Sequence, residues 1–204
     1  MVKVKVCGIT NLDDALAAVE YGADYLGFNF YPPSRRCITP EQAHDIMARL
    51  PEDVAKFALF VNEPEETIRR VLAAGGGAGF SGVQLHGEES AEFCRGWDLT
   101  VIKAFRVKDR VSLRAMENFP ADYYLVDTYA PGYGGSGEAF PWSWLEGLRS
   151  EKLILAGGLH TGNVAEAIRQ VRPYGVDVCT GVEAAPGVKD HEKLKAFISA
   201  AKGA

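Results

Sequence analysis

The sequence predicts a single-domain (β/α)8 barrel, the TIM-barrel architecture, over residues 1–204. Short runs of β-branched and aromatic residues alternate eight times with segments of helical periodicity, which is typical of a parallel sheet covered by helices. Paired glycines come late, after the seventh and eighth runs, where such barrels bind phosphate. A doubly wound open sheet is the alternative. It would place GxGxxG or a P-loop after the first strand, where CGIT stands.

Each predicted strand is a short apolar or alternating run that ends near a glycine, a proline or a polar residue. In the first, VKVKVC, valines alternate with lysines until Gly8 breaks the pattern. The predicted strands are residues 2–7, 24–30, 56–61, 82–85, 100–105, 123–127, 152–156 and 176–179. Because parallel barrel strands all end at one rim, their last residues should face one cavity.

The predicted helices follow from capping residues and from apolar side chains at helical spacing. Asn11, Thr39, Asp109 and Thr161 are the candidate caps. The predicted helices cover residues 11–19, 39–50, 64 to about 75, 88–94, 109–116, 142–148, 161–171 and 190–201. The stretch APGYGGSGEAF after the sixth strand predicts a mobile or ligand-wrapping loop, because four glycines fall within six residues.

Composition fits a globular domain and argues against several functions. Hydrophobic residues make up 47% of the chain, and no apolar run approaches the ~20 residues that span a bilayer. The net charge of −5, with no basic run, argues against nucleic-acid binding. Four scattered cysteines show no metal or dithiol spacing, which predicts free thiols. The sequence enters a strand pattern at Val2 without a signal-peptide leader, so we expect a cytoplasmic protein.

Three side chains at predicted strand ends could exchange protons near neutral pH: Cys7, His86 and Asp127. Each has a structural alternative. Cys7 could be a small buried hydrophobic residue, Asp127 could cap a helix or tie down a loop, and His86 could pack a loop. Their convergence on one predicted rim favours an acid/base site.

Glycines on the same rim predict an anionic ligand. Gly157 and Gly158 follow the seventh strand and Gly181 follows the eighth, so backbone N–H groups can approach a phosphate without interference from a Cβ. Ordinary turns would explain any one of these clusters, and residues 134–137 could close over the anion. On the second loop, the preceding prolines could hold Arg36 rigidly enough to bind a carboxylate, although a solvated surface arginine is the alternative.

Seven motifs, in order along the chain, resemble phosphoribosylanthranilate isomerases: KVCGIT, PPSRR, QLHG, LVDT, GGSGEAF, LAGGL and DVCTGVE. The resemblance implies an Amadori rearrangement of N-(5-phosphoribosyl)anthranilate in tryptophan biosynthesis, without cofactor or metal. It implies Cys7 as general base and Asp127 as general acid, with Arg36 on the anthranilate carboxylate and the late glycine turns on the phosphate. A modest depression of the ordinary cysteine pKa, about 8.5, would place the thiolate near working pH.

The resemblance also implies the substrate-binding residues, which are Arg36, His86, Gly135, Ser136, Gly157, Gly158, Asp177, Gly181 and Val182. Ser136 and Glu138 stand where the family commonly has Thr and Lys, and Cys179 and Thr180 where it often has two serines. Glu138 removes a positive charge from the loop, and phosphate contacts after the eighth strand should come from the backbone. Asp177 matches a family acid whose role the sequence does not indicate.

Two other functions stay open. An isomerase of another phosphosugar intermediate fits the barrel, but some related barrels use aspartates on strands one and six, and Cys7 replaces the first of them. A non-catalytic phosphosugar-binding subunit would explain the glycine turns without the thiol. In every case we expect a small phosphorylated ligand, no nucleic acid, no membrane, and a monomer or homodimer.

Overall fold

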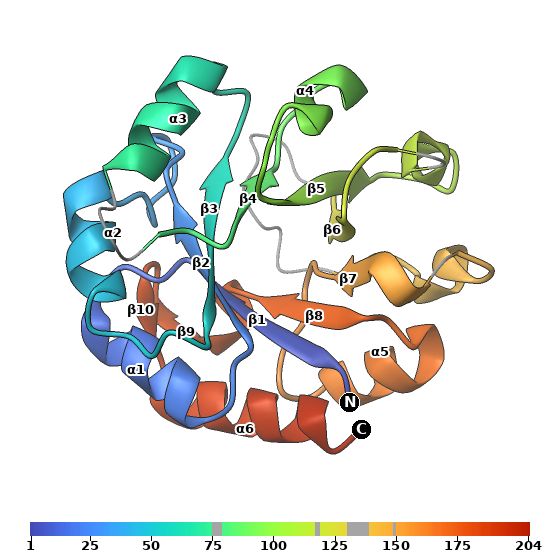
Figure 1. Ribbon diagram of the computed structural model, residues 1–204. Coiled ribbons are helices and arrows are strands. Elements are labelled where there is room, and N and C mark those ends of the chain that lie inside the picture. The colour runs from blue at the N-terminus through green and yellow to red at the C-terminus, as the bar shows by residue number, and fades with distance from the viewer. Residues whose placement is uncertain (75–78, 117–118, 130–138, 149) are drawn as a thin grey trace.

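Eight parallel strands form a closed barrel in chain order, and β8 pairs with β1 to close it (Figure 1). The computed structural model describes residues 1–74, 79–116, 119–129, 139–148 and 150–204. The strands are β1 Lys3–Cys7, β2 Tyr25–Asn29, β3 Ala55–Phe60, β4 Gly82–Leu85, β5 Thr100–Val107, β6 Tyr123–Thr128, β7 Leu153–Leu155 and β8 Gly175–Val178. The predicted (β/α)8 architecture is confirmed.

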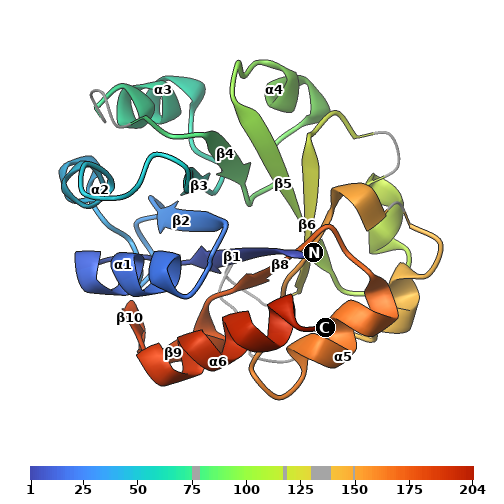
Figure 2. The ribbon, with the colours of Figure 1, turned by 60° about the horizontal axis from the view of Figure 1, so that its bottom comes forward.

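The α-helices surround the strands on the outside of the barrel (Figure 2). They are α1 Leu12–Glu20, α2 Pro40–Met47, α3 Glu65–Ala73, α4 Ala91–Arg95, α5 Val164–Val171 and α6 His191–Lys202. Their apolar sides pack on outward-facing strand residues such as Val4 and Val6 to form the main core, and these side chains are fully buried. The Asn11 and Thr39 side chains cap α1 and α2 as predicted. None of the described helices is long and apolar enough to cross a membrane.

Two predicted helices are instead short 3-10 turns, η1 Ser112–Met116 and η3 Trp142–Leu145. Asp109 accepts the N–H of Ser112, as expected of a cap, but Ser112 is a weak helix former and the turn runs for five residues only. After η3, Gly147 takes a positive φ of 83°, which ends the helical course. Asn163, rather than Thr161, is the N-cap residue of α5.

An antiparallel hairpin between β8 and α6 is absent from the sequence prediction. It consists of β9 Glu183–Ala185 and β10 Val188–Lys189, and the 3-10 turn η5 Thr180–Val182 precedes it. Gly187 makes the tight turn with a φ of 84°. The hairpin brings two charged side chains, Glu183 and Lys189, against the end of β1.

Inward-facing side chains fill the barrel in layers. Apolar residues including Phe57, Ile102 and Leu125 form the central layer. Nearer the amino ends of the strands, the hydroxyls of Tyr25 and Tyr174 lie 2.6 Å apart. At the carboxyl ends the packing opens into a cavity, which is lined by several of the residues that the sequence predicts to be functional.

Candidate active site

A cavity of about 460 Å³ lies at the carboxyl ends of the barrel strands. Its lining includes these residues predicted from the sequence: Cys7, Arg36, His86, Asp127, Gly157, Gly158, Asp177 and Gly181. Gly135, Ser136 and Glu138 lie outside the described residues. Val182, expected to bind substrate, does not reach the cavity, because its side chain is buried in the main core and its N–H donates to the Cys179 carbonyl.

Cys7, the last residue of β1, points inward and is only 6% exposed. Burial raises the pKa of its thiol above the ordinary value, while the ammonium groups of Lys5 and Lys189 oppose that rise. A thiolate near working pH would need a modestly depressed pKa. In the free protein the direction is the reverse, because the depth of burial at the barrel mouth outweighs the two cations.

Asp127 and His86 face each other across the cavity. His86 Nε2 lies 3.4 Å from Asp127 Oδ2, and the other Asp127 oxygen accepts the N–H of Thr128 at 2.7 Å. On the far side of the imidazole, Gln84 Nε2 lies 2.9 Å from His86 Nδ1. With the Gln84 amide donating to Nδ1, the imidazole proton sits on Nε2 and faces the carboxylate. The imidazole N–H can therefore help to orient the Asp127 carboxyl group.

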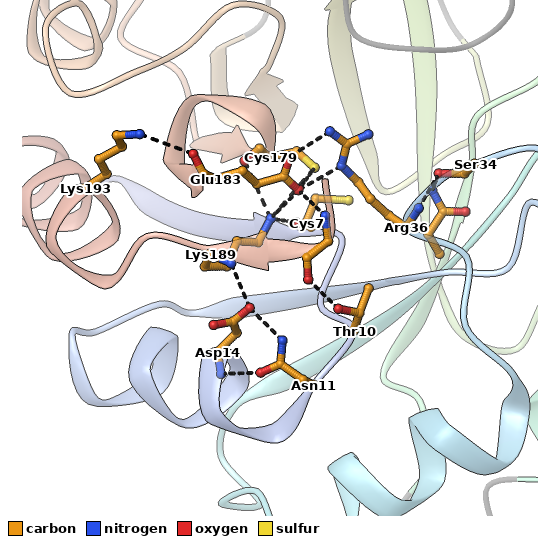
Figure 3. A network of polar contacts seen from close by, with 12 residues as sticks. Cys7, Thr10, Asn11, Asp14, Ser34, Arg36, Cys179, Glu183, Lys189 and Lys193 are labelled. Atoms are coloured by element: carbon orange, nitrogen blue, oxygen red, sulfur yellow. Dashed lines mark hydrogen bonds and ion pairs between the residues drawn. The ribbon is translucent and has the colours of Figure 1, made fainter. Parts of the chain in front are cut away.

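Arg36 makes a two-point ion pair with Glu183 at the cavity wall (Figure 3). Its Nε and Nη2 donate to the two carboxylate oxygens at 2.8 and 2.6 Å. The pair lowers the pKa of Glu183 to about 2 against the effect of burial, so the carboxylate is ionised. Two of the five guanidinium N–H groups are used in this pair, and no hydrogen bond to another described residue uses the remaining three.

Lys189 connects the hairpin to the strand that carries Cys7. Its ammonium donates to the Cys7 carbonyl at 2.6 Å and to Glu183 Oε1 at 3.2 Å, and its backbone N–H donates to Asp14 of α1. Figure 3 shows Cys7, Glu183 and Cys179 gathered around this lysine. The hairpin therefore holds the base of the cavity in place.

Two glycine turns form another part of the cavity wall. Gly157 and Gly158 have φ values of 80° and 64°, in the left-handed region that favours glycine. A Cβ at Gly181 would lie 2.0 Å from the carbonyl of Leu159, so the two turns are in close contact. Both line the cavity, and such turns can present backbone N–H groups to a phosphate.

Four residues of this site were missed from the sequence: Lys5, Gln84, Glu183 and Lys189. A signal existed for Lys5, because strand alternation puts it on the same inward face as Cys7, where a charged side chain is unusual. For Glu183 the partner lies 147 residues away, and no local pattern reveals it. Within the described part of the chain, no group of His, Cys, Asp and Glu side chains could hold a metal ion.

Comparisons with known proteins converge on one family. A family model described as N-(5'phosphoribosyl)anthranilate (PRA) isomerase matches residues 4–200. The N-(5'-phosphoribosyl)anthranilate isomerase of Pelobacter propionicus is 50% identical over 204 residues, which cover 99% of this chain and 96% of the relative. The phosphoribosyl anthranilate isomerase of Thermotoga maritima has a crystal structure similar to this chain, with a TM-score of 0.93 and 48% identity over 100% of both chains. Another solved isomerase, with a TM-score of 0.87 and 44% identity over 100% of both chains, is in complex with reduced 1-(o-carboxyphenylamino)-1-deoxyribulose 5-phosphate.

Proposed function

Because this chain belongs to the N-(5'-phosphoribosyl)anthranilate isomerase family of tryptophan biosynthesis, we propose that Cys7 and Asp127 carry out the family's reaction here. That reaction is the Amadori rearrangement of N-(5'-phosphoribosyl)anthranilate to 1-(2-carboxyphenylamino)-1-deoxyribulose 5-phosphate. The observation that supports the assignment most is that a thiol and a carboxylate from different strands line one cavity together with two glycine turns.

Binding uses the two ends of the substrate. The phosphate lies at the turns that contain Gly157, Gly158 and Gly181, whose N–H groups approach it closely. The anthranilate carboxylate pairs with the guanidinium N–H groups that Arg36 does not use on Glu183. Holding both ends places the ribose between Cys7 and Asp127, and this positioning supplies much of the rate enhancement.

Asp127 acts first, as general acid. It gives its proton to the ribose ring oxygen as the bond from C1' to that oxygen breaks, and the ring opens to a protonated Schiff base. His86 lies beside the carboxyl group, where its Nε2–H can help to orient that group toward the ring oxygen. The product of this step carries a positive charge next to C2', which makes the C2' proton acidic.

Cys7 then acts as general base. Its thiolate takes the C2' proton, the electron pair of the C–H bond moves to form an enolamine, and tautomerisation gives the ketone. The reaction therefore needs Cys7 deprotonated and Asp127 protonated. This state holds the same number of protons as the state with a neutral thiol and an ionised carboxylate, and the two differ only in where the proton lies. Groups that stabilise the thiolate enlarge the competent fraction.

The test is to mix the protein with freshly generated N-(5'-phosphoribosyl)anthranilate and follow its fluorescence. We expect a decay much faster than the uncatalysed background, and a loss of ~10²- to 10⁴-fold in turnover for Cys7→Ser and for Asp127→Asn. A decay at the background rate would overturn the proposed reaction. Full activity in either variant would remove that residue from its role.

We also propose that the protein is cytoplasmic and that it is a monomer or homodimer, as expected from the sequence. Membership of a biosynthetic family supports the location. Light scattering on the purified protein measures the oligomeric state directly.

A further inference from the structure

We propose that Lys5 is a positioning residue for the catalytic base: its ammonium, held by Asp177, faces the Cys7 sulfur and supplies the positive charge that a thiolate needs. The inference rests on the proposed role of Cys7 in the reaction. It assigns a task to Lys5 and to Asp177, whose part in the site was open.

Lys5 lies inside the barrel mouth with 1% of its surface exposed, two residues before Cys7 and on the same face of β1. The register of β1 and β8 puts it opposite Asp177, and its Nζ donates to Asp177 Oδ1 at 2.6 Å. Burial alone would lower the pKa of this amine, but Asp177 and Cys7 raise it above the ordinary value. Lys5 is therefore a fixed cation.

The ammonium and the thiol meet over Gly27 of β2. A Cβ built on Gly27 would lie 3.0 Å from Lys5 Nζ and 3.0 Å from Cys7 Sγ, so both atoms occupy the space that this glycine leaves open. The ammonium of Lys5 lowers the pKa of the Cys7 thiol, against the larger effect of burial. The shared space over Gly27 shows that the two groups lie close together.

The balance of charges around Cys7 also favours a thiolate at that residue. The described ionised groups around Cys7 are Lys5 on β1, Asp177 on β8, Glu183 on β9, Lys189 on β10 and Arg36 on the second loop, and His86 and Asp127 face it across the cavity. The first five comprise three cations and two carboxylates. One negative charge would neutralise the cluster, and a Cys7 thiolate provides it. Burial raises the pKa of the neighbouring Cys179 thiol to about 12, so Cys179 stays neutral.

A purely structural ion pair would not need this placement. Replacing a buried pair by apolar side chains is often neutral for stability, because the desolvation of both ions offsets their attraction. An ammonium beside the sulfur and a carboxylate behind the ammonium have opposite effects on the thiol: Lys5 lowers the pKa of Cys7 and Asp177 raises it. The two residues thus set the charge state of the base together.

The test measures the alkylation of Cys7 by iodoacetamide in the full-length free protein between pH 7 and pH 10, read by peptide mass spectrometry. Because only the thiolate reacts, a shift of one pKa unit changes the rate at pH 8 about tenfold. We expect Lys5→Met to react roughly tenfold more slowly at pH 8 and Asp177→Asn to react faster. The double variant Lys5→Met/Asp177→Asn should fall between them.

Cys37, which is exposed and lies outside this cluster, is the internal control and should keep its rate in every variant. Circular dichroism verifies that each variant folds. If Lys5→Met does not fold, the double variant takes its place in the comparison, because it leaves no buried charge unpaired. A folded Lys5 variant with the parent's pH dependence at Cys7 would overturn the proposal, as would a slower reaction in Asp177→Asn. The alkylation rate of Cys7 does not depend on turnover. If the rates shift as expected but the protein has no isomerase activity, the proposed function is wrong and the role of Lys5 and Asp177 stands.

Discussion

Glu183 fixes the orientation of the Arg36 guanidinium. The carboxylate accepts two hydrogen bonds from one edge of the guanidinium, which fixes the plane of the group and turns its remaining N–H groups toward the cavity. The same carboxylate accepts from Lys189, so the orientation of Arg36 is coupled to the hairpin. In the proposed binding mode, recognition of the substrate carboxylate thus depends on a residue that does not touch it.

Glu183→Gln should weaken substrate binding more than it slows turnover. The amide keeps one acceptor but loses the charge and the two-point geometry, so we expect KM to rise roughly tenfold, about 1.4 kcal/mol, with kcat within a factor of three. Steady-state kinetics separate the two constants. Glu192→Gln, on the exposed side of α6, is the matched control and should change neither. An unchanged KM would show that Arg36 needs no such support.

Gly27 is the residue that makes room for the base and its cation. Gly27→Ala places a methyl group 3.0 Å from both Cys7 Sγ and Lys5 Nζ, so at least one must move. We expect kcat to fall roughly 10- to 100-fold with the fold retained, because small misplacements of reacting groups are costly. Gly96→Ala, where the added Cβ would find its nearest contact at 3.6 Å, should retain parent kinetics. Equal activity in the two variants would contradict this account.

At the scale of the element, the β9–β10 hairpin is the part of the fold that the sequence did not predict. Its strands are three and two residues long, too short for an alternating pattern, and only Gly187 marks the turn. The eight barrel strands were found because each is a distinct apolar run. The 3-10 turns were predicted as helices because apolar spacing does not tell one turn from several.

Lys189→Met should lower both stability and activity. The substitution removes the ammonium that joins the Cys7 carbonyl to Glu183, and Arg36 is then the one cation paired with that carboxylate among the described residues. Removing one partner of a buried ion pair predicts a loss of roughly 3 kcal/mol in the free energy of unfolding, measured by urea denaturation. Lys195→Met, exposed on α6, is the control and should stay within about 0.5 kcal/mol of the parent. A loss no larger than the control's would mean that the hairpin does not hold β1.

At the scale of the whole molecule, the barrel class and part of the cavity wall followed from the sequence, because the carboxyl ends of parallel strands meet at one rim. Cys7, Asp127, His86 and the glycine turns were found in this way and line one cavity. The ion pairs around the cavity were not predicted from the sequence. Lys5 and Asp177 are 172 residues apart, and only closure of β8 on β1 makes them neighbours.

Inorganic phosphate should stabilise the folded barrel if the glycine turns bind it. At a concentration ten times its dissociation constant, a ligand of the native state adds about 1.4 kcal/mol, which raises the Tm by roughly 3–6 °C for a domain of this size. Differential scanning fluorimetry against chloride at matched ionic strength separates specific binding from a general salt effect. No difference between the two salts up to 50 mM would argue against a phosphate site at these turns.

Barrel closure also has a consequence for synthesis of the protein on the ribosome. Cys7 lies on the first strand of the barrel, whereas Lys189, whose ammonium donates to the Cys7 carbonyl, follows 182 residues later. At roughly 5–20 residues per second, translation takes on the order of 10 to 40 s to cover that distance. Until then the nascent chain carries Cys7 and Lys5 without Lys189. Chains released early, before Lys189, should therefore be inert, and isomerisation begins only when translation has passed the hairpin.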